Sequence, residues 1–375
     1  MRRACMMILA VGTTAISAQQ PSVPPTSSAG NLQQTTLQFT AKVKEPLTLP
    51  SHAMIDFPAC GASGAVFFRF VMPPSYVQQE LYAVSPKGEV RNFSFGNIPG
   101  LSNATLLSFD ASNSETYALL SAQPGNAVAS HIPGAPGSQP EDGARQHPSK
   151  LFLATFDLDG KYVDAVPLDL PFRPIRIAAL GEDSLVVLGI ETTTARPVLA
   201  LLDSHGNSLR PLESEDAISP ADTILHSSKR GEAMLESIPG PGRLRAALSR
   251  FSFVHYRGSL LLLEPGSKPK VTEISVGGQF RTVQLHLPPG FDADSLLSSD
   301  RYWLLRVLPV DEAEKHPEGS KEDWGLFQFD PDTGDFLRKI NAGDLAASDI
   351  VCAHDGEFLA FQWVDGKTHL MAANP

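Results

Sequence analysis

Two charged stretches of the chain carry the residue types from which a ligand site could be built. Residues 237–250 contain three arginines, and residues 309–323 contain acidic groups and a histidine. A guanidinium is a planar fork that holds a carboxylate or phosphate through two hydrogen bonds, so a basic loop beside an acidic loop could clamp a charged ligand. The candidate binding residues are Arg243, Arg245, Arg250, Glu312, Glu314 and His316. The alternative is that these loops pair with each other or are only solvated.

Motifs of common catalytic centres are missing from the sequence. It contains no GxSxG, HExxH, GxxxxGKS/T or CxxC pattern, and these spacings build nucleophile elbows, zinc sites, phosphate loops and redox dithiols. Glu312, Glu314 and His316 could ligate a metal chemically, but their spacing matches no strong metal motif. We therefore assign no catalytic residue and no metal ligand, and the pattern names no cofactor.

The elements that must position these residues are β-hairpins, and the stretch LFLATFDLDGKYVDAVPL shows their design most clearly. Its first half, residues 151–158, is almost continuously apolar, as expected for a strand covered on both faces. Asp157 then precedes a turn closed by Gly160, where the carboxylate can accept from backbone N–H groups and glycine can take the positive φ. The return strand, residues 161–168, is more polar and contains Pro167, which predicts an edge strand.

Four weaker copies of this hairpin recur along the chain. Their turns lie at Ser85, Asp203, Glu264 and Asp330, and the copy at Glu264 is the most divergent. Five hairpins of one design imply a repeated unit. We interpret each as the third and fourth strands of a β-propeller blade, a four-stranded antiparallel sheet with an apolar middle and a polar outer strand.

Two inner strands are expected upstream of each hairpin, and for the fourth blade we place them at residues 223–226 and 232–236. Three more strands, at residues 350–353, 357–364 and 367–372, form a sixth blade that lacks its fourth strand. The segment Leu37–Leu47 can supply it, which closes the ring and removes free sheet edges. The predicted fold is therefore an all-β, six-bladed β-propeller. The competing architecture is a pair of β-sandwich domains joined by residues 123–149.

The N-terminus has the pattern of an export signal. Arg2 and Arg3 precede an apolar run, and small residues follow at Ser17 and Ala18. The alternative is a membrane anchor, but the run is short for a span. We expect a signal peptide at 1–18, a flexible Pro/Ser-rich lead at 19–34 and a single propeller domain at 35–375. The mature chain is then secreted or periplasmic, without membrane insertion.

The remaining cysteines are expected to meet at the closure of the ring. Cys60 falls in the first blade and Cys352 in the sixth. An exported pair can be oxidised, so a disulfide between them is expected. The alternative is two separate buried thiols.

The runs FDLDGKYV and FDPDTGDFL resemble the strand-turn-strand that ends a blade in NHL-type and TolB-like six-bladed propellers. The resemblance covers most of residues 35–375 as architecture, but only these two runs match closely. In those families the motif is structural, so the resemblance implies a fold and no activity.

Charge and repeat architecture together indicate a function class. The formal net charge of −11, without a Lys/Arg-rich segment, argues against a nucleic-acid partner. We predict a monomeric, non-catalytic binding or scaffold propeller that recognises a protein or glycan through long loops on one face. The alternative is a lactonase-like metal-dependent hydrolase or lyase with its site at the channel mouth. Six polar residues near inner strands fall at hairpin ends away from the expected face and are less favoured: Asp110, Glu182, Asp183, Asp300, His354 and Asp355.

Overall fold

The structure, a computed structural model, describes most of residues 34–373. Outside the described residues lie 42–46, 49–53, 72–79, 125–148, 213–216, 311–324 and shorter gaps at 208, 229–231, 233–234, 237, 241, 300–301, 344, 346–348, 355 and 366. The chain divides into residues 1–33 and residues 34–375, and the first unit, with the predicted signal peptide, also lies outside them. All the described strands and helices belong to the second unit.

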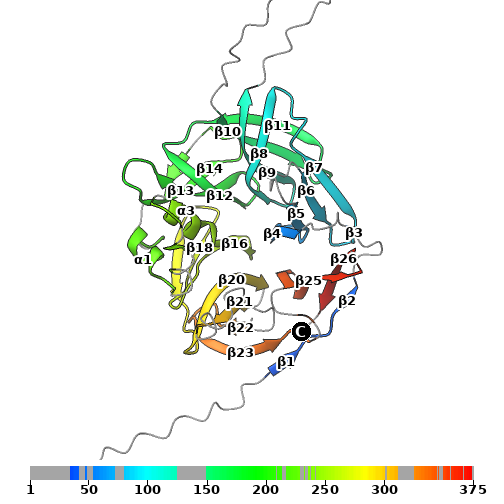
Figure 1. The fold of residues 1–375 in the computed structure, drawn as a ribbon, viewed down its shortest axis with the longest axis vertical. Helices are drawn as coiled ribbons and strands as arrows, with labels where there is room; N and C mark the ends of the chain where they lie inside the picture. The colour runs from blue at the N-terminus through cyan, green and yellow to red at the C-terminus, as the bar shows by residue number, and fades with distance from the viewer. Residues whose placement is uncertain are drawn as a thin grey trace, which may run out of the picture. The chain divides into compact units, whose positions relative to one another are not determined.

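Six antiparallel sheets form a ring in this unit, which confirms the predicted all-β, six-bladed propeller (Figure 1). In each blade the chain runs from the innermost strand outward in sequence order. Blade one consists of β4 (Met54–Cys60), β5 (Val66–Val71), β6 (Glu80–Val84) and β7 (Val90–Ser94). Blade two consists of β8 (Leu101–Ala111), β9 (Glu115–Pro124), β10 (Lys150–Asp157) and β11 (Tyr162–Leu168). Blade three consists of β12 (Phe172–Leu180), β13 (Ser184–Glu191), β14 (Pro197–Asp203) and β15 (Leu209–Pro211).

The other three blades follow the same plan. Blade four consists of β16 (Ser252–Tyr256), β17 (Ser259–Glu264), β18 (Lys270–Ile274) and β19 (Phe280–Gln284). Blade five consists of β20 (Phe291–Ser299), β21 (Tyr302–Pro309), β22 (Gly325–Phe329) and β23 (Phe336–Asn341). Blade six contains β24 (Ile350–His354), β25 (Glu357–Val364) and β26 (Lys367–Ala373).

The N-terminal part of the unit lies against the last two blades. Strands β2 (Thr40–Ala41) and β3 (Leu47–Thr48) both pair antiparallel with β26, on the outside of blade six. Strand β1 (Gln34–Thr36) pairs parallel with β23 of blade five, a contact that the sequence does not predict. A disulfide joins Cys60 to Cys352 across 292 residues, with 5.8 Å between their Cα atoms.

The turn chemistry predicted for the hairpins is confirmed. In blade two, Oδ1 of Asp157 accepts from the backbone N–H groups of Asp159 (3.0 Å) and Lys161 (2.8 Å). Asp203 and Asp330 cap their turns in the same way. Gly160 takes a positive φ of 84°. The acidic residues of these turns therefore serve local structure.

The predicted inner strands of blade four are wrong. Residues 221–225 form helix α1 (Ala221–Leu225), and Glu232, Leu235 and Glu236 are also helical. The stretch expected to be a loop at 237–250 contains helix α3 (Gly242–Ser249). The true inner strands are β16 and β17, so the divergent hairpin at Glu264 joins the second and third strands of its blade.

The physical reason is a helical period that the prediction of a loop at 237–250 overlooked. Leu244, Ala247, Leu248 and Phe251 recur at three- and four-residue spacing and are all buried. They belong to one apolar cluster with side chains of blades three and four. The described residues between 212 and 251 therefore form an insert with helices α1 and α3, whose buried apolar side chains pack with those of blades three and four.

Candidate functional site

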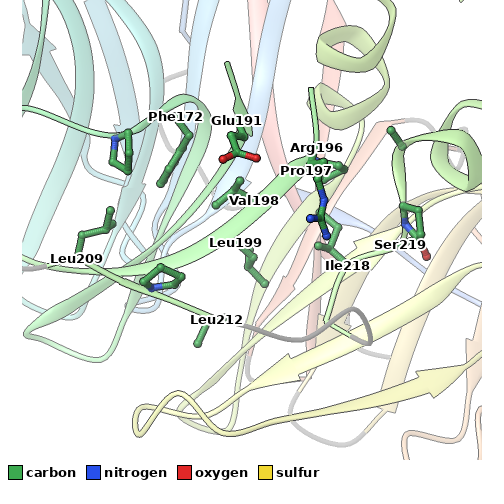
Figure 2. Close-up of a pocket in the computed structure, with 14 residues that line it drawn as sticks. Phe172, Glu191, Arg196, Pro197, Val198, Leu199, Leu209, Leu212, Ile218 and Ser219 are labelled. Carbon is green, nitrogen blue, oxygen red and sulfur yellow. The ribbon is translucent and has the colours of Figure 1, made fainter. Parts of the chain in front are cut away.

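A cavity of about 620 Å³ lies where blade three meets this insert. Its walls come from the end of β13, the start of β14, the short strand β15 and the first residues of the insert (Figure 2). Pockets that take small ligands or peptide side chains span roughly 300 to 1,000 Å³. The cavity is thus large enough to hold several side chains of a partner.

The pocket lies where the described part of the outer strand of blade three ends. In blade two, β11 pairs with β10 from Leu151 to Phe156. In blade three, the described residues of β15 pair with β14 at residues 200–202, and Leu212 extends this contact by one hydrogen bond to Leu199. Pro197 and Val198, at the start of β14, lie beyond these pairings and line the pocket.

The lining of the pocket is mainly apolar and rich in proline. Phe172, Leu199 and Ile218 are buried at its base, whereas Val198 and Leu212 are half-buried. Four prolines complete the walls: Pro171, Pro197, Pro211 and Pro220. Because a proline ring fixes φ, these walls lose little conformational entropy when a ligand binds.

The insert side of the pocket is pinned to blade four by a buried ion pair. Nζ of Lys270 lies 2.7 Å from Oε1 of Glu264, and the two side chains are 16% and 9% exposed. Both partners also hold Ser219 of the pocket wall: its backbone N–H donates to Glu264 (3.0 Å), and Lys270 donates to its hydroxyl (3.1 Å). The hydroxyl of Thr272 donates to the carbonyl of Ala217 (3.0 Å). These bonds hold the insert wall of the pocket against blade four.

An acidic and a basic residue stand on one tight turn at the rim. The backbone N–H of Glu191 donates to the carbonyl of Arg196 (2.9 Å), and Ala195 between them has a positive φ of 54°. Thr194 donates a hydrogen bond to the Glu191 carboxylate. Glu191 is half-buried and Arg196 is exposed. Figure 2 shows both side chains on the same side of the pocket as Phe172, opposite Leu209 and Leu212.

The structure places the three predicted arginines on or beside α3, and none of them lines this pocket. Arg243 donates to the carbonyls of Ile238 (2.9 Å) and Glu236 (3.2 Å), so its guanidinium holds the insert together. Arg245 is exposed as a residue. Partial burial, and to a smaller extent the positive charge of Arg173, lower its pKa. Arg250 is half-buried just after the helix. Glu312, Glu314 and His316 lie outside the described residues, so the predicted clamp stays a prediction.

Sequence reasoning missed the pocket residues. Glu191 and Arg196 sit in an ordinary polar turn, ETTTAR, that matches no motif. A signal was present in the prolines at 171, 197, 211 and 220, which gather at strand ends and flank a very short outer strand. No sequence pattern indicates that these strand ends contact the insert.

Metal clusters and membrane-spanning helices are both missing from the described residues. No group of three or more His, Cys, Asp or Glu side chains among them is arranged to hold a metal ion. No helix in the described part of the chain has the length and apolar character needed to cross a membrane.

Comparison with known proteins finds distant structural likenesses and no matching family. No protein-family model matches the sequence, and no curated protein matches it. Among solved structures, TolB from Acinetobacter baumannii is 10% identical over 79% of this chain and 59% of that chain, with a TM-score of 0.36. An oligogalacturonate lyase in complex with manganese is 11% identical over 91% of this chain and 98% of that chain, with a TM-score of 0.39. A nidogen/laminin complex is 8% identical over 77% of this chain and 81% of that chain, with a TM-score of 0.38.

The sheet order by itself confirms the six-bladed architecture that the resemblance to TolB-like propellers implies. This chain spans only 43% of another match, the dipeptidyl peptidase 4 of Porphyromonas gingivalis, with 10% identity and a TM-score of 0.38. At such low sequence identities, the activities and partners of these proteins cannot be assigned to this chain.

Proposed function

We propose that the chain is an exported, non-catalytic binding propeller that recognises an extended apolar segment of a partner protein. The observation that carries this proposal is the mainly apolar pocket of about 620 Å³ between blade three and the insert. Export is supported by the N-terminal signal pattern and by the Cys60–Cys352 disulfide, since disulfides persist in oxidising compartments.

The chemistry of the lining favours a peptide over a glycan. Carbohydrates need many hydrogen-bonding groups, whereas only Glu191, Arg196 and Ser219 of the lining carry polar side chains. Ser219 is already bonded to Glu264 and Lys270. Apolar side chains entering this pocket gain roughly 25 cal/mol for each Å² removed from water. The ligand therefore contributes apolar side chains.

The rim charges orient the bound segment. Glu191 attracts a basic group and Arg196 an acidic one, and opposite charges at defined positions fix register more than they add affinity. We expect the ligand to have a short apolar core flanked by one basic and one acidic residue.

Selection of random peptides tests this proposal. Heptapeptides displayed on phage are selected on the full chain, and the affinity of the winners is measured by fluorescence anisotropy. Ala221→Glu puts a carboxylate on the pocket wall and should weaken binding by at least about tenfold, because a charge must lose water inside an apolar site. Arg196→Glu should shift the selected flanking residue from acidic to basic.

The matched control is Thr223→Glu, which adds the same charge to the exposed side of the same helix. It should leave peptide affinity within about twofold of the wild type. Peptides that bind Ala221→Glu as tightly as the wild type would contradict the proposal. The proposal would also be contradicted if no peptide bound and a neutral oligosaccharide bound to the wild type but more weakly to Ala221→Glu.

A further inference from the structure

A second cavity, about 260 Å³, lies at the opposite end of strand β13. It is lined by the turns that join the first and second strands of their blades, and these converge from five blades around the ring axis. They contribute Ala62, Asn113, Gly181, Arg257, Gly258 and His354. We call this cavity the channel mouth. Its volume is below the range of roughly 300 to 1,000 Å³ of drug-sized sites, so it suits a small ion or molecule.

A histidine of the channel mouth is held by a carboxylate from two blades away. Nε2 of His255, on β16, lies 3.1 Å from Oδ2 of Asp110, on β8. The side chains are 19% and 10% exposed. Asp110 also accepts from the backbone N–H of Ala179 on β12 (2.8 Å), so its orientation is fixed by the blade between them.

The positive charge of Arg176 interacts with the Asp110 carboxylate of this pair. Arg176, on β12, donates to the carbonyls of Phe251 and Ser249, and burial lowers its pKa to about 10 against the opposing effect of Asp110. Burial alone would lower the pKa of His255, but the charge and hydrogen bond of Asp110 outweigh it and raise that pKa. The imidazole therefore favours the protonated form more than a histidine in water does.

The lining of the channel mouth contains basic side chains. Among the described residues that form it, these are His255, His354 and Arg257, and none of the lining residues carries a carboxylate. The guanidinium of Arg257 lies 5.1 Å from the ring centre of Tyr256. A nearby acid, Glu182, already accepts hydrogen bonds from Ser114 and Ser112, which lower its pKa.

We propose that the channel mouth binds a small oxyanion, a mono- or dicarboxylate or a phosphate, with His255, His354 and Arg257 as its cationic partners. When His255 is protonated and gives Nε2–H to Asp110, its second ring nitrogen is a donor for the anion. Asn113 and Ser259 add neutral polar groups to the same lining. This site is independent of the peptide pocket, which lies at the other end of blade three.

Calorimetric titration of the full chain tests the proposal, with sodium succinate and inorganic phosphate as separate probes. We expect binding at pH 6 that weakens as the pH rises past the pKa of His255. His255→Gln and His354→Gln should each raise the dissociation constant by about tenfold or more, because a charged hydrogen bond to the anion is lost. Preference for succinate or for phosphate distinguishes a planar from a tetrahedral ligand, and either supports the site.

The matched control is His205→Gln, which removes an exposed histidine from the turn between β14 and β15. It should leave anion affinity unchanged. His354→Gln keeps the test decisive if His255→Gln fails to fold, since His354 belongs to β24 of blade six, whereas the buried Asp110–His255 pair joins blades two and four. Absence of binding by both anions at pH 6, or equal affinity in His354→Gln and the wild type, would overturn the proposal.

Discussion

The two ends of blade three differ in chemistry although they share the same strands. Strand β13 is buried from Leu185 to Leu188, and its two ends open into two different cavities. At the Glu191 end, the apolar start of β14 lies beyond the described pairing with β15 and forms a pocket wall. At the Gly181 end, turns from several blades line one cavity and bring polar side chains to it. Apolar strand ends set the chemistry of one site, and polar turns set that of the other.

The largest effect that separates the two sites should come from the disulfide. Cys60 and Cys352 lie two residues before Ala62 and His354 of the channel mouth, and their bond closes a loop of 292 residues. A Cys60→Ala/Cys352→Ala variant should lose up to about 5 kcal/mol of unfolding free energy. Urea denaturation measures this loss. Succinate and phosphate affinity should fall with it, whereas peptide affinity at blade three should be retained.

Reduction of the wild type with a thiol reagent is the control for the disulfide variant, because it removes the bond without changing the residues. Both samples should behave alike. Equal losses of affinity at the two cavities would show that closure of the ring supports the whole molecule evenly, and the contrast between the sites would then be lost.

A second change should break the peptide pocket and spare the channel mouth. Lys270→Met leaves the Glu264 carboxylate buried without its cation, and breaking a buried pair in this way costs about 3 to 5 kcal/mol. The pocket wall at Ser219 loses a bond at the same time. Arg281→Gln is the matched control, since Arg281 is 47% exposed and its pairs with Glu273 and Asp332 are worth roughly 0 to 1 kcal/mol. Similar denaturation midpoints for the two variants would contradict this assignment.

The repeated hairpins could be predicted because their signals are local. Asp157, Gly160 and Pro167 act within a few residues of themselves, and the turn type follows from their backbone and hydrogen-bonding preferences. The inner strands of the fourth blade are misplaced for an equally local reason. Short apolar runs around Ile224 and Leu235 fit a strand or a helix, and only packing against two blades decides between them.

The sites could not be predicted because they depend on contacts between distant segments. Asp110 and His354 are visible in the sequence as polar residues at hairpin ends, where spacing alone offers them no partner. His255 lies in no motif, yet it meets Asp110 across 145 positions of sequence. The pocket likewise needs the start of β14 and residue 219 to meet, and no spacing rule brings them together.

A third test uses pH to separate the two buried charge pairs. The pKa of His255 is raised in the folded state, so its contribution to stability is fully present below about pH 6.5 and is lost as the pH rises through the raised value. Asp110→Asn removes the cause of the shift. The difference in unfolding free energy between wild type and Asp110→Asn should therefore be larger at pH 5.5 than at pH 8.5.

Lys270→Met provides the comparison for this pH test. This buried pair contains no histidine, so the destabilisation by Lys270→Met should not be larger at pH 5.5 than at pH 8.5. Guanidinium denaturation at both pH values measures the two differences. A pH-independent effect of Asp110→Asn would mean that His255 is not coupled to Asp110 in solution.

The smallest expected effect on affinity comes from moving the His354 side chain at the channel mouth. Gly64 has a positive φ of 76°, and a Cβ added there would lie 2.3 Å from Cδ2 of His354, so Gly64→Ala must displace the imidazole. Gly100 has the same φ of 76° with open space around it. Gly100→Ala thus carries only the backbone strain of roughly 1 to 2 kcal/mol that both variants share. Succinate and phosphate affinity should fall in Gly64→Ala alone, and peptide affinity in neither. Equal anion affinity in the two alanine variants would show that the position of the His354 ring does not matter for the ligand, and that the cation at the mouth comes from His255 and Arg257.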